Sequence, residues 1–448
     1  MKQTAVGLIP DDWEVKTLIE IGYFIGGGTP NTNIPSYWKG TIPWVSSSDI
    51  KKDSITSLIP TRFITQEAIN NSATKLCPPD TLLIVSRVGV GKLAIAEEEV
   101  CTSQDFSNFV CTKQNVKFIA YELLQKMQKK AEEAQGTSIK GITTEEIKLL
   151  NIPIPPLAEQ YRIAKALSDV DAVINTTEKL IQKKKNIKQG TMQSLLTGKK
   201  RLPGFGDKQT DLFVPNGTHT KEVKDVSPEQ IRLSAKMKQT GLGEIPEDWE
   251  VKNINKECTI KARIGWQGLK STEYLDSGDY ILITGTDFDS GFINWKSCSY
   301  VTKWRFDQDK NIQIKQGDVL ITKDGTIGKV AFLNEIPMQG TLNSGVFVIR
   351  PKNPDKMDSV FLSLIFKSFW FDSFLEQITS GSTIVHLYQK DFVKFNFPLP
   401  SKEEQTAIAN VLSSMDKEIE TLNTKLEKYR NLKTAMMQQL LTGKIRLI

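Results

Sequence analysis

The chain contains the same opening sequence twice. Its first residues read MKQTAVGLIPDDWEVK, and KMKQTGLGEIPEDWEVK follows at residues 236–252. Met237 and Trp249 each lie 236 positions after Met1 and Trp13. A repeat of this length predicts two related structural units within one polypeptide.

A second repeat closes each half. LLTGKKRL at 195–202 matches LLTGKIRL at 440–447, now at an offset of 245 positions, so the segments between the repeats differ in length. The stretches upstream, PPLAEQYRIAKALSDVDAVI and PSKEEQTAIANVLSSMDKEI, also match in register. Each half therefore has a constant head, a variable body of about 140 residues and a constant tail, which indicates duplication.

The two tails predict long helices. Their apolar residues recur at alternating steps of four and three, the heptad pattern of a helix-helix seam. The predicted seam residues are Ile163, Leu167, Val170, Ile174, Ile181 and Leu195 in the first tail, and Ile408, Leu412, Met415, Ile419, Leu422, Leu426, Tyr429, Met436 and Leu440 in the second. Lys433 breaks the second seam, and Gly198 and Gly443 are expected to end the helices.

The two predicted helices are too long to be buried on their own domains. Each would extend about 54 to 60 Å at 1.5 Å per residue. The simplest partner for one seam is the other, which gives a two-stranded coiled coil inside one chain. Packing of the helices on unrelated subunits is the alternative.

The variable bodies predict mixed α/β domains. Short apolar strands such as TLLIVS, KLAIA, DYILITG, GDVLIT, KVAFL and GVFVIRP are separated by Gly, Asp and Pro. Helical patterns occur at YELLQKMQKKAEEA and DSVFLSLIFKSFWFDSFLEQI. The predicted organisation is a first domain at 1–154, a helix at 155–198, a linker at 199–240, a second domain at 241–399 and a helix at 400–443.

The sequence offers no set of catalytic or metal-binding residues. SRVGVGK (86–92) and TKDGTIGK (322–329) resemble phosphate loops but lack their spacing and their Ser or Thr, so we interpret them as hairpin turns. The only histidines, His219 and His386, lie far apart, and the five cysteines have no CxxC spacing, which predicts buried free thiols. The amino terminus lacks a signal peptide and no apolar run could cross a membrane, so we expect a cytoplasmic protein.

These motifs together resemble the specificity subunit of type I restriction-modification enzymes. The resemblance covers essentially the whole chain. It rests on IPDDWEVK and IPEDWEVK, on GGGTPNTNIPSYWKGTIPWVSSSDI and KLCPPDTLLIVSRVGVGKLAIA in the first body, on QGDVLITKDGTIGKVAF in the second, and on both tails.

The resemblance implies a non-catalytic DNA reader. Its fold would be two α/β target-recognition domains separated by two antiparallel coiled-coil helices, with pseudo-twofold symmetry. Each domain would read one half of a bipartite, asymmetric site in double-stranded DNA, while the helices set the spacing and dock two methyltransferase subunits. Those partners would carry S-adenosylmethionine, restriction-translocase subunits would complete the enzyme, and this chain would hold no cofactor.

Two other classes of function remain open. The chain could be a self-contained DNA methyltransferase or nuclease, which methyl transfer by the isolated chain would establish. It could also be a DNA-independent coiled-coil scaffold, which salt-dependent binding to a bipartite duplex would exclude.

Polar residues in loops beside strands are the candidates for DNA contact, because base and phosphate contacts need paired donors, acceptors or positive charge. They are Trp44, Ser47, Lys51, Lys52, Arg87, Lys92 and Gln104 in the first body, and Arg263, Trp266, Gln267, Lys270, Thr284, Lys323 and Lys329 in the second. Solvated surface, or core packing for the tryptophans, is the alternative. The candidates for docking of partner proteins are Glu159, Gln160, Glu404 and Gln405, for which packing within the chain is the alternative.

Overall fold

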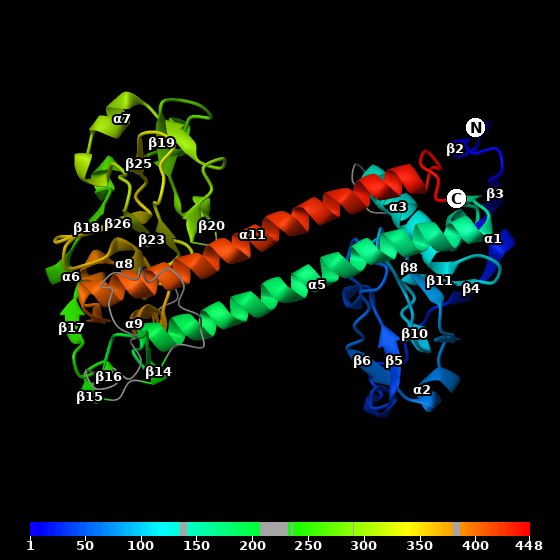
Figure 1. Cartoon of the computed structure of the whole chain (residues 1–448), viewed down its shortest axis with the longest axis horizontal. Coiled ribbons are helices and arrows are strands. Elements are labelled where there is room, and N and C mark those ends of the chain that lie inside the picture. Colours follow the sequence, from blue (N-terminus) through cyan, green and yellow to red (C-terminus); the bar gives the residue numbers. More distant parts are fainter. Residues whose placement is uncertain (135–140, 207–231, 234–235, 290, 380–385) are drawn as a thin grey trace, which may run out of the picture. The chain divides into compact units, whose positions relative to one another are not determined.

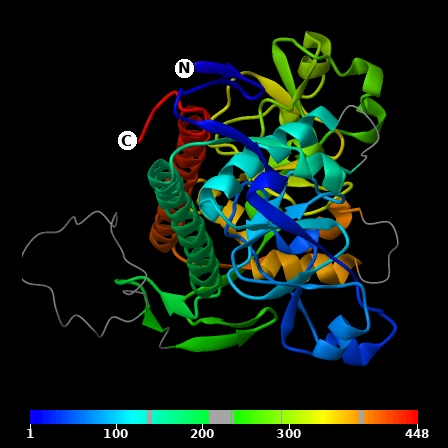
Figure 2. The same cartoon turned by 90° about the vertical axis from the view of Figure 1, so that its right-hand side faces the viewer.

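The computed structural model describes residues 1–134, 141–206, 232–233, 236–289, 291–379 and 386–448. The chain divides into two compact units (Figure 1): the first joins Met1–Leu180 to Leu422–Ile448, and the second is Ile181–Thr421. Each unit contains one variable body and a portion of both long helices, α5 (Leu157–Leu196) and α11 (Lys402–Leu440). Because the first unit draws on both ends of the chain, it contains both termini (Figure 2).

The first body is built on two four-stranded sheets. One is antiparallel, in the order β4-β11-β8-β9, and the other has the order β6-β5-β10-β7, with β10 parallel to β5. Its strands are β1 (Lys2–Thr4), β2 (Gly7–Ile9), β3 (Glu14–Thr17), β4 (Gly22–Gly26), β5 (Ile42–Val45), β6 (Arg62–Ile64), β7 (Leu76–Cys77), β8 (Thr81–Val85), β9 (Leu93–Ile95), β10 (Val100–Thr102), β11 (Phe106–Cys111) and β12 (Asn151–Ile154). Its helices are α1 (Leu18–Ile21), α2 (Gln66–Asn70), α3 (Val116–Ala134) and α4 (Thr144–Lys148).

Strand β8 explains why the first body has three layers. All five of its residues are buried, as expected of a continuous apolar run covered on both faces. Leu82 and Ile84 belong to the core that includes residues of α3, whereas Leu83 and Val85 belong to the core shared with Val45 of the other sheet. The antiparallel sheet therefore lies between helix α3 and the second sheet.

The second body repeats this arrangement. Its antiparallel sheet has the order β18-β26-β23-β24, and its other main sheet has the order β22-β19-β25, with β19 parallel to β25. Its strands are β15 (Met237–Thr240), β16 (Gly243–Pro246), β17 (Glu250–Asn253), β18 (Cys258–Ala262), β19 (Tyr280–Ile283), β20 (Phe288–Asp289), β21 (Phe292–Ile293), β22 (Ser299–Val301), β23 (Val319–Thr322), β24 (Val330–Phe332), β25 (Gly340–Leu342), β26 (Val346–Pro351) and β27 (Asn396–Leu399). Its helices are α6 (Ile254–Glu257), α7 (Lys303–Asp307), α8 (Ser359–Ile365), α9 (Phe369–Thr379) and α10 (Gln389–Phe392).

The helical pattern at 358–378 forms two helices, where the sequence predicts one. Helix α8 ends before Phe366, and α9 begins at Phe369. The Ser368 side chain accepts a hydrogen bond from the backbone N–H of Trp370, at 3.3 Å, in the manner of an N-cap. The interruption lets both helices pack on the same apolar core, to which Phe361 and Phe371 contribute.

The predicted linker is partly structured. Within the described residues of 199–240, β13 (Lys200–Arg201) pairs with β14 (Arg232–Leu233). The repeated MKQT segment forms β15, which pairs with β16, just as β1 pairs with β2 in the first body. The last residues assigned to the linker therefore belong to the second body, and residues 207–231 lie outside the described part of the chain.

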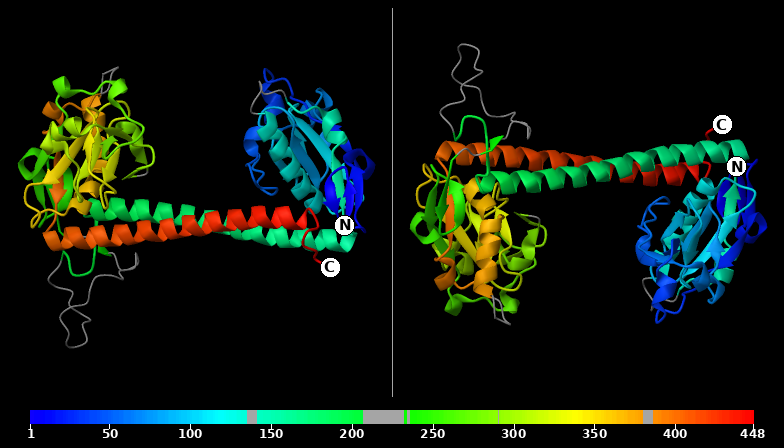
Figure 3. Two further views of the ribbon diagram at one scale, coloured as in Figure 1. Left: turned by 90° about the horizontal axis from the view of Figure 1, so that it is seen from above. Right: turned by 90° about the horizontal axis from the view of Figure 1, so that it is seen from below.

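Helices α5 and α11 run antiparallel within each unit (Figure 3). In the first unit, Asp171 pairs with Lys433 and Glu178 pairs with Arg430; in the second, Lys184 pairs with Glu418. None of the predicted seam residues is exposed. Ten of them are buried, namely Ile163, Leu167, Ile174, Ile181, Leu195, Ile408, Leu412, Ile419, Leu426 and Leu440, and Val170, Met415, Leu422, Tyr429 and Met436 are half-buried.

Lys433 interrupts the seam because it serves a buried polar network. Its ammonium lies 2.7 Å from a carboxylate oxygen of Asp171 and donates to the backbone carbonyl of Asp53 at 2.7 Å. The Tyr121 hydroxyl donates to the same Asp171 carboxylate at 2.7 Å, and burial together with this carboxylate raises the pKa of Tyr121. The network ties helix α11 to α5, to α3 and to a loop of the first body.

The cysteines are free thiols, as predicted from their spacing. Cys77, Cys101, Cys258 and Cys298 are buried and Cys111 is half-buried. Burial raises the pKa of the Cys77 thiol to about 12. Among the described residues, no helix combines the length and apolar character needed to cross a bilayer.

Glu122 on α3 makes the stability of the first unit depend on pH. Its carboxyl is buried, and its Oε1 has no hydrogen-bond partner among the described residues. Burial raises its pKa to about 8, and Lys126 opposes this only in part. Between its ordinary pKa and 8 the folded chain binds more protons than the unfolded chain, so stability falls as pH rises through this window.

Glu122→Gln is therefore expected to remove this pH dependence and to raise the free energy of unfolding at pH 8 by about 4 kcal/mol. Thermal unfolding from pH 5 to 9 measures the effect, with Glu132→Gln on the exposed side of the same helix as the control. An unchanged pH slope in Glu122→Gln would contradict the assignment.

Candidate nucleic-acid interface

Each constant tail binds a constant head through an arginine. The first clasp consists of Asp12, Trp13, Glu159 and Arg446. Arg446 lies 2.7 Å from carboxylate oxygens of both Asp12 and Glu159, and the Trp13 indole donates to Glu159 at 3.1 Å. The clasp therefore joins the head, the start of α5 and the segment after α11 within the first unit.

The second clasp repeats this geometry with Asp248, Trp249, Glu404 and Arg201. Arg201 lies 2.6 Å from Glu404 and 2.7 Å from Asp248, and Trp249 donates to Glu404 at 3.0 Å. Burial opposes the charge of Arg201, but its bonds to the two carboxylates raise the pKa of the guanidinium. Trp13 and Trp249 are thus structural, as the sequence predicts for constant positions.

The glycine that ends each helix fits the same clasp. Gly198 and Gly443 have φ angles of +67° and +68°, in the left-handed region that favours glycine. A Cβ at Gly198 would lie 2.3 Å from Pro246, and one at Gly443 would lie 2.5 Å from Pro10. The LLTGK and IP-x-D-W repeats therefore occur together because they pack against each other.

The four residues predicted to dock partner proteins are buried inside the units. Glu159 and Glu404 belong to the clasps. Gln160 donates to the carbonyl of Pro155 at 2.9 Å, and Gln405 donates to that of Pro400 at 2.9 Å. All four side chains are at most 3% exposed, so the structure replaces the docking role with the alternative of packing within the chain.

Two predicted DNA-contact loops meet in the first body. The β8–β9 pairing makes SRVGVGK a hairpin turn, as predicted. Lys92 in this turn donates to the backbone carbonyl of Ser47 at 3.0 Å. Ser46 begins the loop that contains Ser47, and its hydroxyl donates to Asp49 at 2.8 Å. These bonds fix both loops on one edge of the body.

The second body holds its loops in the same way. The β23–β24 pairing makes TKDGTIGK a hairpin turn. Thr284 donates to Asp287 through its backbone N–H at 2.7 Å and through its hydroxyl at 2.8 Å. The hydroxyl of Thr284 is thus engaged as a local cap, while Lys329 at the end of the hairpin is exposed.

A backbone junction beside each hairpin has the same geometry in both bodies. In the first, the N–H of Ser86 donates to the carbonyl of Asp105, and its carbonyl accepts from the N–H of Ile142, each at 2.8 Å. In the second, Lys323 makes the matching bonds with Gly345 and Leu387, each at 2.9 Å. We call Ser86 with Ile142, and Lys323 with Leu387, the first and second hairpin junctions.

The structure corrects two of the DNA-contact predictions. Trp44 is 3% exposed, and its indole donates to the carbonyl of Gly28 at 2.9 Å, so it packs in the core. Arg263 is 2% exposed and donates to the carbonyl of Leu342 at 2.8 Å. Both side chains are buried and donate hydrogen bonds to backbone carbonyls within the body. This excludes them as direct contacts to DNA.

The other residues predicted to contact DNA differ in their exposure and in their partners within the chain. Gln267 is buried, with an Oε1 that has no partner in the described part of the chain, and the side chain of Trp266 lies outside the described residues. Gln104 is exposed and accepts from the hydroxyl of Thr29. Lys270 is exposed, while Lys323 is half-buried, with its ammonium 5.5 Å from the Phe347 ring centroid.

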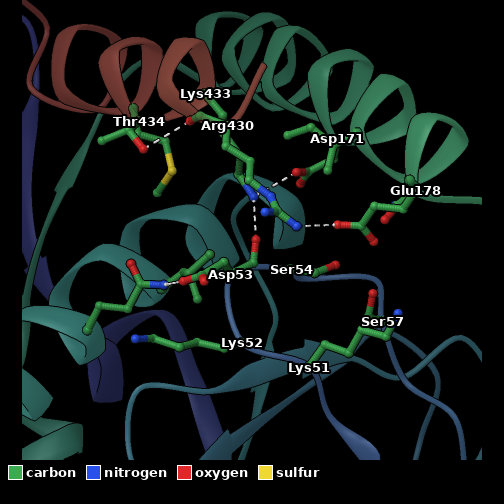
Figure 4. Close-up of a pocket in the computed structure, with 15 residues that line it drawn as sticks. Lys51, Lys52, Asp53, Ser54, Ser57, Asp171, Glu178, Arg430, Lys433 and Thr434 are labelled. Carbon is green, nitrogen blue, oxygen red and sulfur yellow. Dashed lines mark hydrogen bonds and ion pairs between the residues drawn. The ribbon is translucent and has the colours of Figure 1, made fainter. Parts of the chain in front are cut away.

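Lys51 and Lys52 line a cavity of about 420 Å³ in the first unit, between a loop of the body and helices α5 and α11 (Figure 4). The other cations of this cavity are paired: Lys433 with Asp171, and Arg430 with Glu178 at 2.8 Å. Lys51 and Lys52 are exposed and have no ion pair among the described residues. Their free charge suits a phosphate group.

Sequence reasoning missed residues at the hairpin junctions. The Nδ1 of His386 lies within hydrogen-bond distance of a carboxylate oxygen of Asp324, at 2.8 Å, and with Tyr388 the two residues line a cavity of about 240 Å³ in the second unit. In the first body the positions that correspond are Gly141 and Arg87. Aligning TSIKGI (137–142) with STIVHL (382–387), at the offset of the tails, would have placed His386 opposite Gly141.

Comparison with known proteins identifies both halves. The family model described as "Type I restriction modification DNA specificity domain" matches residues 10–189 and 246–428. The MjaVIII specificity subunit of a type I restriction enzyme from Methanocaldococcus jannaschii is 26% identical over 98% of this chain and 94% of its own length. The EcoR124I/EcoR124II specificity subunit of Escherichia coli is 33% identical over 36% of this chain and 42% of its own length.

A solved structure shows the same fold. The S subunit of a type I restriction-modification system from M. genitalium superposes with a TM-score of 0.56 at 14% identity, over 98% of both chains. The family match covers one variable body and part of one long helix in each half, which agrees with the internal repeat. The chain therefore belongs to the specificity subunits of type I restriction-modification systems, with one DNA specificity domain in each half.

Proposed function

We propose that each domain reads one half of a bipartite site in double-stranded DNA and that the two halves differ. One observation carries this proposal: both bodies hold the same loops on the same hydrogen-bonded frame, but the side chains on that frame differ. Base edges are read by side chains, whereas backbone geometry sets their position. A constant frame with unlike side chains is what two readers of unlike half-sites require.

The helices would hold the domains apart and receive the partner proteins. Helix α5 has 40 residues, which corresponds to about 60 Å. In the first unit the two helices carry exposed apolar side chains, including Tyr161, Val173 and Leu432, which suit a protein partner. We propose that two methyltransferase subunits dock along the helices, that they carry S-adenosylmethionine, and that restriction-translocase subunits complete the enzyme in the cytoplasm.

The chain itself would be non-catalytic. The clasps and the Lys433 network use their charged residues in pairs that hold the fold together. Lys51 and Lys52 would contact the phosphate backbone, which gives affinity without sequence preference. The isolated chain is thus expected to bind DNA and to transfer no methyl group.

Mapping of methylated positions tests this function. The chain is combined with its methyltransferase subunit, and modified bases are located across a genome. The expected result is a split motif whose two halves differ. A single short continuous motif would contradict the two-reader proposal, methyl transfer by the isolated chain would indicate an enzyme, and the absence of salt-dependent DNA binding would indicate a scaffold.

A further inference from the structure

The two hairpin junctions place different chemistry at one equivalent position. In the first body, Arg87 follows Ser86, and Gly141 precedes Ile142. In the second, Asp324 follows Lys323, and His386 precedes Leu387. Because the backbone bonds of both junctions match within 0.1 Å (2.8 Å against 2.9 Å), the side chains at these positions are the variable part of a shared frame.

Arg87 has no side-chain partner within the part of the chain that the structure describes. It is exposed, and its guanidinium makes no hydrogen bond or ion pair with the described residues. Gly141 contributes no side chain beside it: a Cβ there would lie 3.1 Å from the Cγ of Arg87 and 2.7 Å from the carbonyl oxygen of Ser86. The glycine therefore leaves room for Arg87 to extend from the hairpin.

An unpaired arginine fork matches one base edge well. The two parallel N–H groups of a guanidinium bind the O6 and N7 acceptors of guanine together, which is the commonest specific contact in the major groove. A phosphate contact is the competing use of the same group. Lysine separates the two uses, because it keeps the charge but loses the planar fork.

The Asp324–His386 pair offers hydrogen-bond acceptors where Arg87 offers donors. Both side chains are 40% exposed, and the Nδ1 of His386 lies 2.8 Å from a carboxylate oxygen of Asp324. A carboxylate is repelled by phosphates, so contact with the DNA backbone is disfavoured. When Nδ1 carries the proton toward Asp324, the other ring nitrogen is an acceptor, so the pair offers only acceptors.

Acceptors of this kind suit an exocyclic amino group. In the major groove, cytosine presents the N4 amino group and adenine the N6 amino group, and carboxylates accept from cytosine N4. Tyr388 is 55% exposed, and its ring centroid lies 5.7 Å from that of His386, which adds an apolar face to the same site. The pair is thus built to receive a base and to reject a phosphate.

We infer that this position is a specificity determinant in both domains: Arg87 reads a guanine in one half-site, and Asp324 with His386 reads an amino-bearing base in the other. The inference rests on the proposed function, since it assigns residues to the two half-sites. According to this inference, the two domains read different bases because different side chains follow and precede the same hydrogen-bonded backbone junction.

Methylation mapping with variants of the full chain, in complex with its methyltransferase subunit, tests the inference. Arg87→Lys and Arg87→Ala are expected to reduce discrimination for guanine at one position of one half-motif by roughly 10- to 100-fold, with the other half unchanged. Asp324→Asn and His386→Ala are expected to relax one position in the other half only. Lys75→Ala and Asp276→Asn, exposed residues of the same two domains, serve as controls that leave the motif unchanged.

The outcomes separate this inference from the proposed function. If the unaltered chain gives no split motif, the proposed function itself fails. If the motif is split but Arg87→Lys keeps full guanine preference while Arg87→Ala weakens binding to all sequences, Arg87 contacts phosphate and the inference is wrong. A motif unchanged by Asp324→Asn and His386→Ala overturns the second assignment.

Discussion

Arg201→Ala is expected to lower the free energy of unfolding of the second unit by about 3 to 5 kcal/mol, because removing one partner leaves a buried carboxylate uncompensated. The side chains of Arg201 and Glu404 are 4% and 1% exposed, so Glu404 would be left buried without its cation. Denaturant unfolding monitored by circular dichroism measures the loss. Glu404→Gln in the Arg201→Ala background is expected to recover part of it, because the stranded charge is removed.

The first clasp supplies the matched control for this experiment. Arg446 pairs with Asp12 and Glu159, the repeat equivalents of the carboxylates that bind Arg201, but its side chain is 25% exposed. Arg446→Ala is therefore expected to cost less than Arg201→Ala, since water can solvate Glu159 when the guanidinium is gone. Equal losses in the two variants would contradict the argument from burial.

Lys433→Met is expected to lower the free energy of unfolding of the first unit by about 3 kcal/mol. Methionine fills the seam but leaves Asp171, which is 5% exposed, with the Tyr121 hydroxyl as its remaining partner in the network. The double variant Asp171→Asn with Lys433→Met is expected to recover most of the loss. Chemical unfolding of the single and double variants measures the coupling between the two residues.

The second unit again offers the control. Lys188 and Asp416 are the repeat equivalents of Lys433 and Asp171, and they form an ion pair whose side chains are 23% and 43% exposed. Lys188→Met is expected to cost less than about 1 kcal/mol, as for a solvent-exposed pair. A larger loss in Lys188→Met than in Lys433→Met would show that burial does not decide the strength of these pairs.

The long helices could be predicted from sequence because their signal is local and periodic. The heptad positions from Ile163 to Leu440 are buried or half-buried, as their spacing predicts. The hairpin turns at 86–92 and 322–329 were also predictable, because glycines separate short apolar strands there. The break in the seam at Lys433 was visible in the sequence, but its partners Asp171, Asp53 and Tyr121 were not.

The candidate interface was less predictable because residue type does not report burial. Trp44 and Arg263 are suited to DNA contact by their chemistry, yet both are enclosed by the core of a domain. His386 was not a candidate because the other histidine, His219, lies far from it in the sequence, although its partner is Asp324, 62 residues away. Such pairs depend on which loops the sheets bring together, and the spacing of residues along the chain does not reveal this.

The sequence by itself determined that the chain holds two copies of one unit, that each copy ends in a long amphipathic helix, and that the constant and variable segments have separate roles. These properties follow from the internal repeat and from the spacing of apolar residues, and both can be read from the positions of residues in the sequence. Only the tertiary structure decided that each tail is clasped by a head, that Glu159, Gln160, Glu404 and Gln405 are buried, and that Arg87 and the Asp324–His386 pair occupy equivalent positions. Those facts depend on contacts between residues distant in sequence, because burial and pairing arise only when the sheets and helices pack.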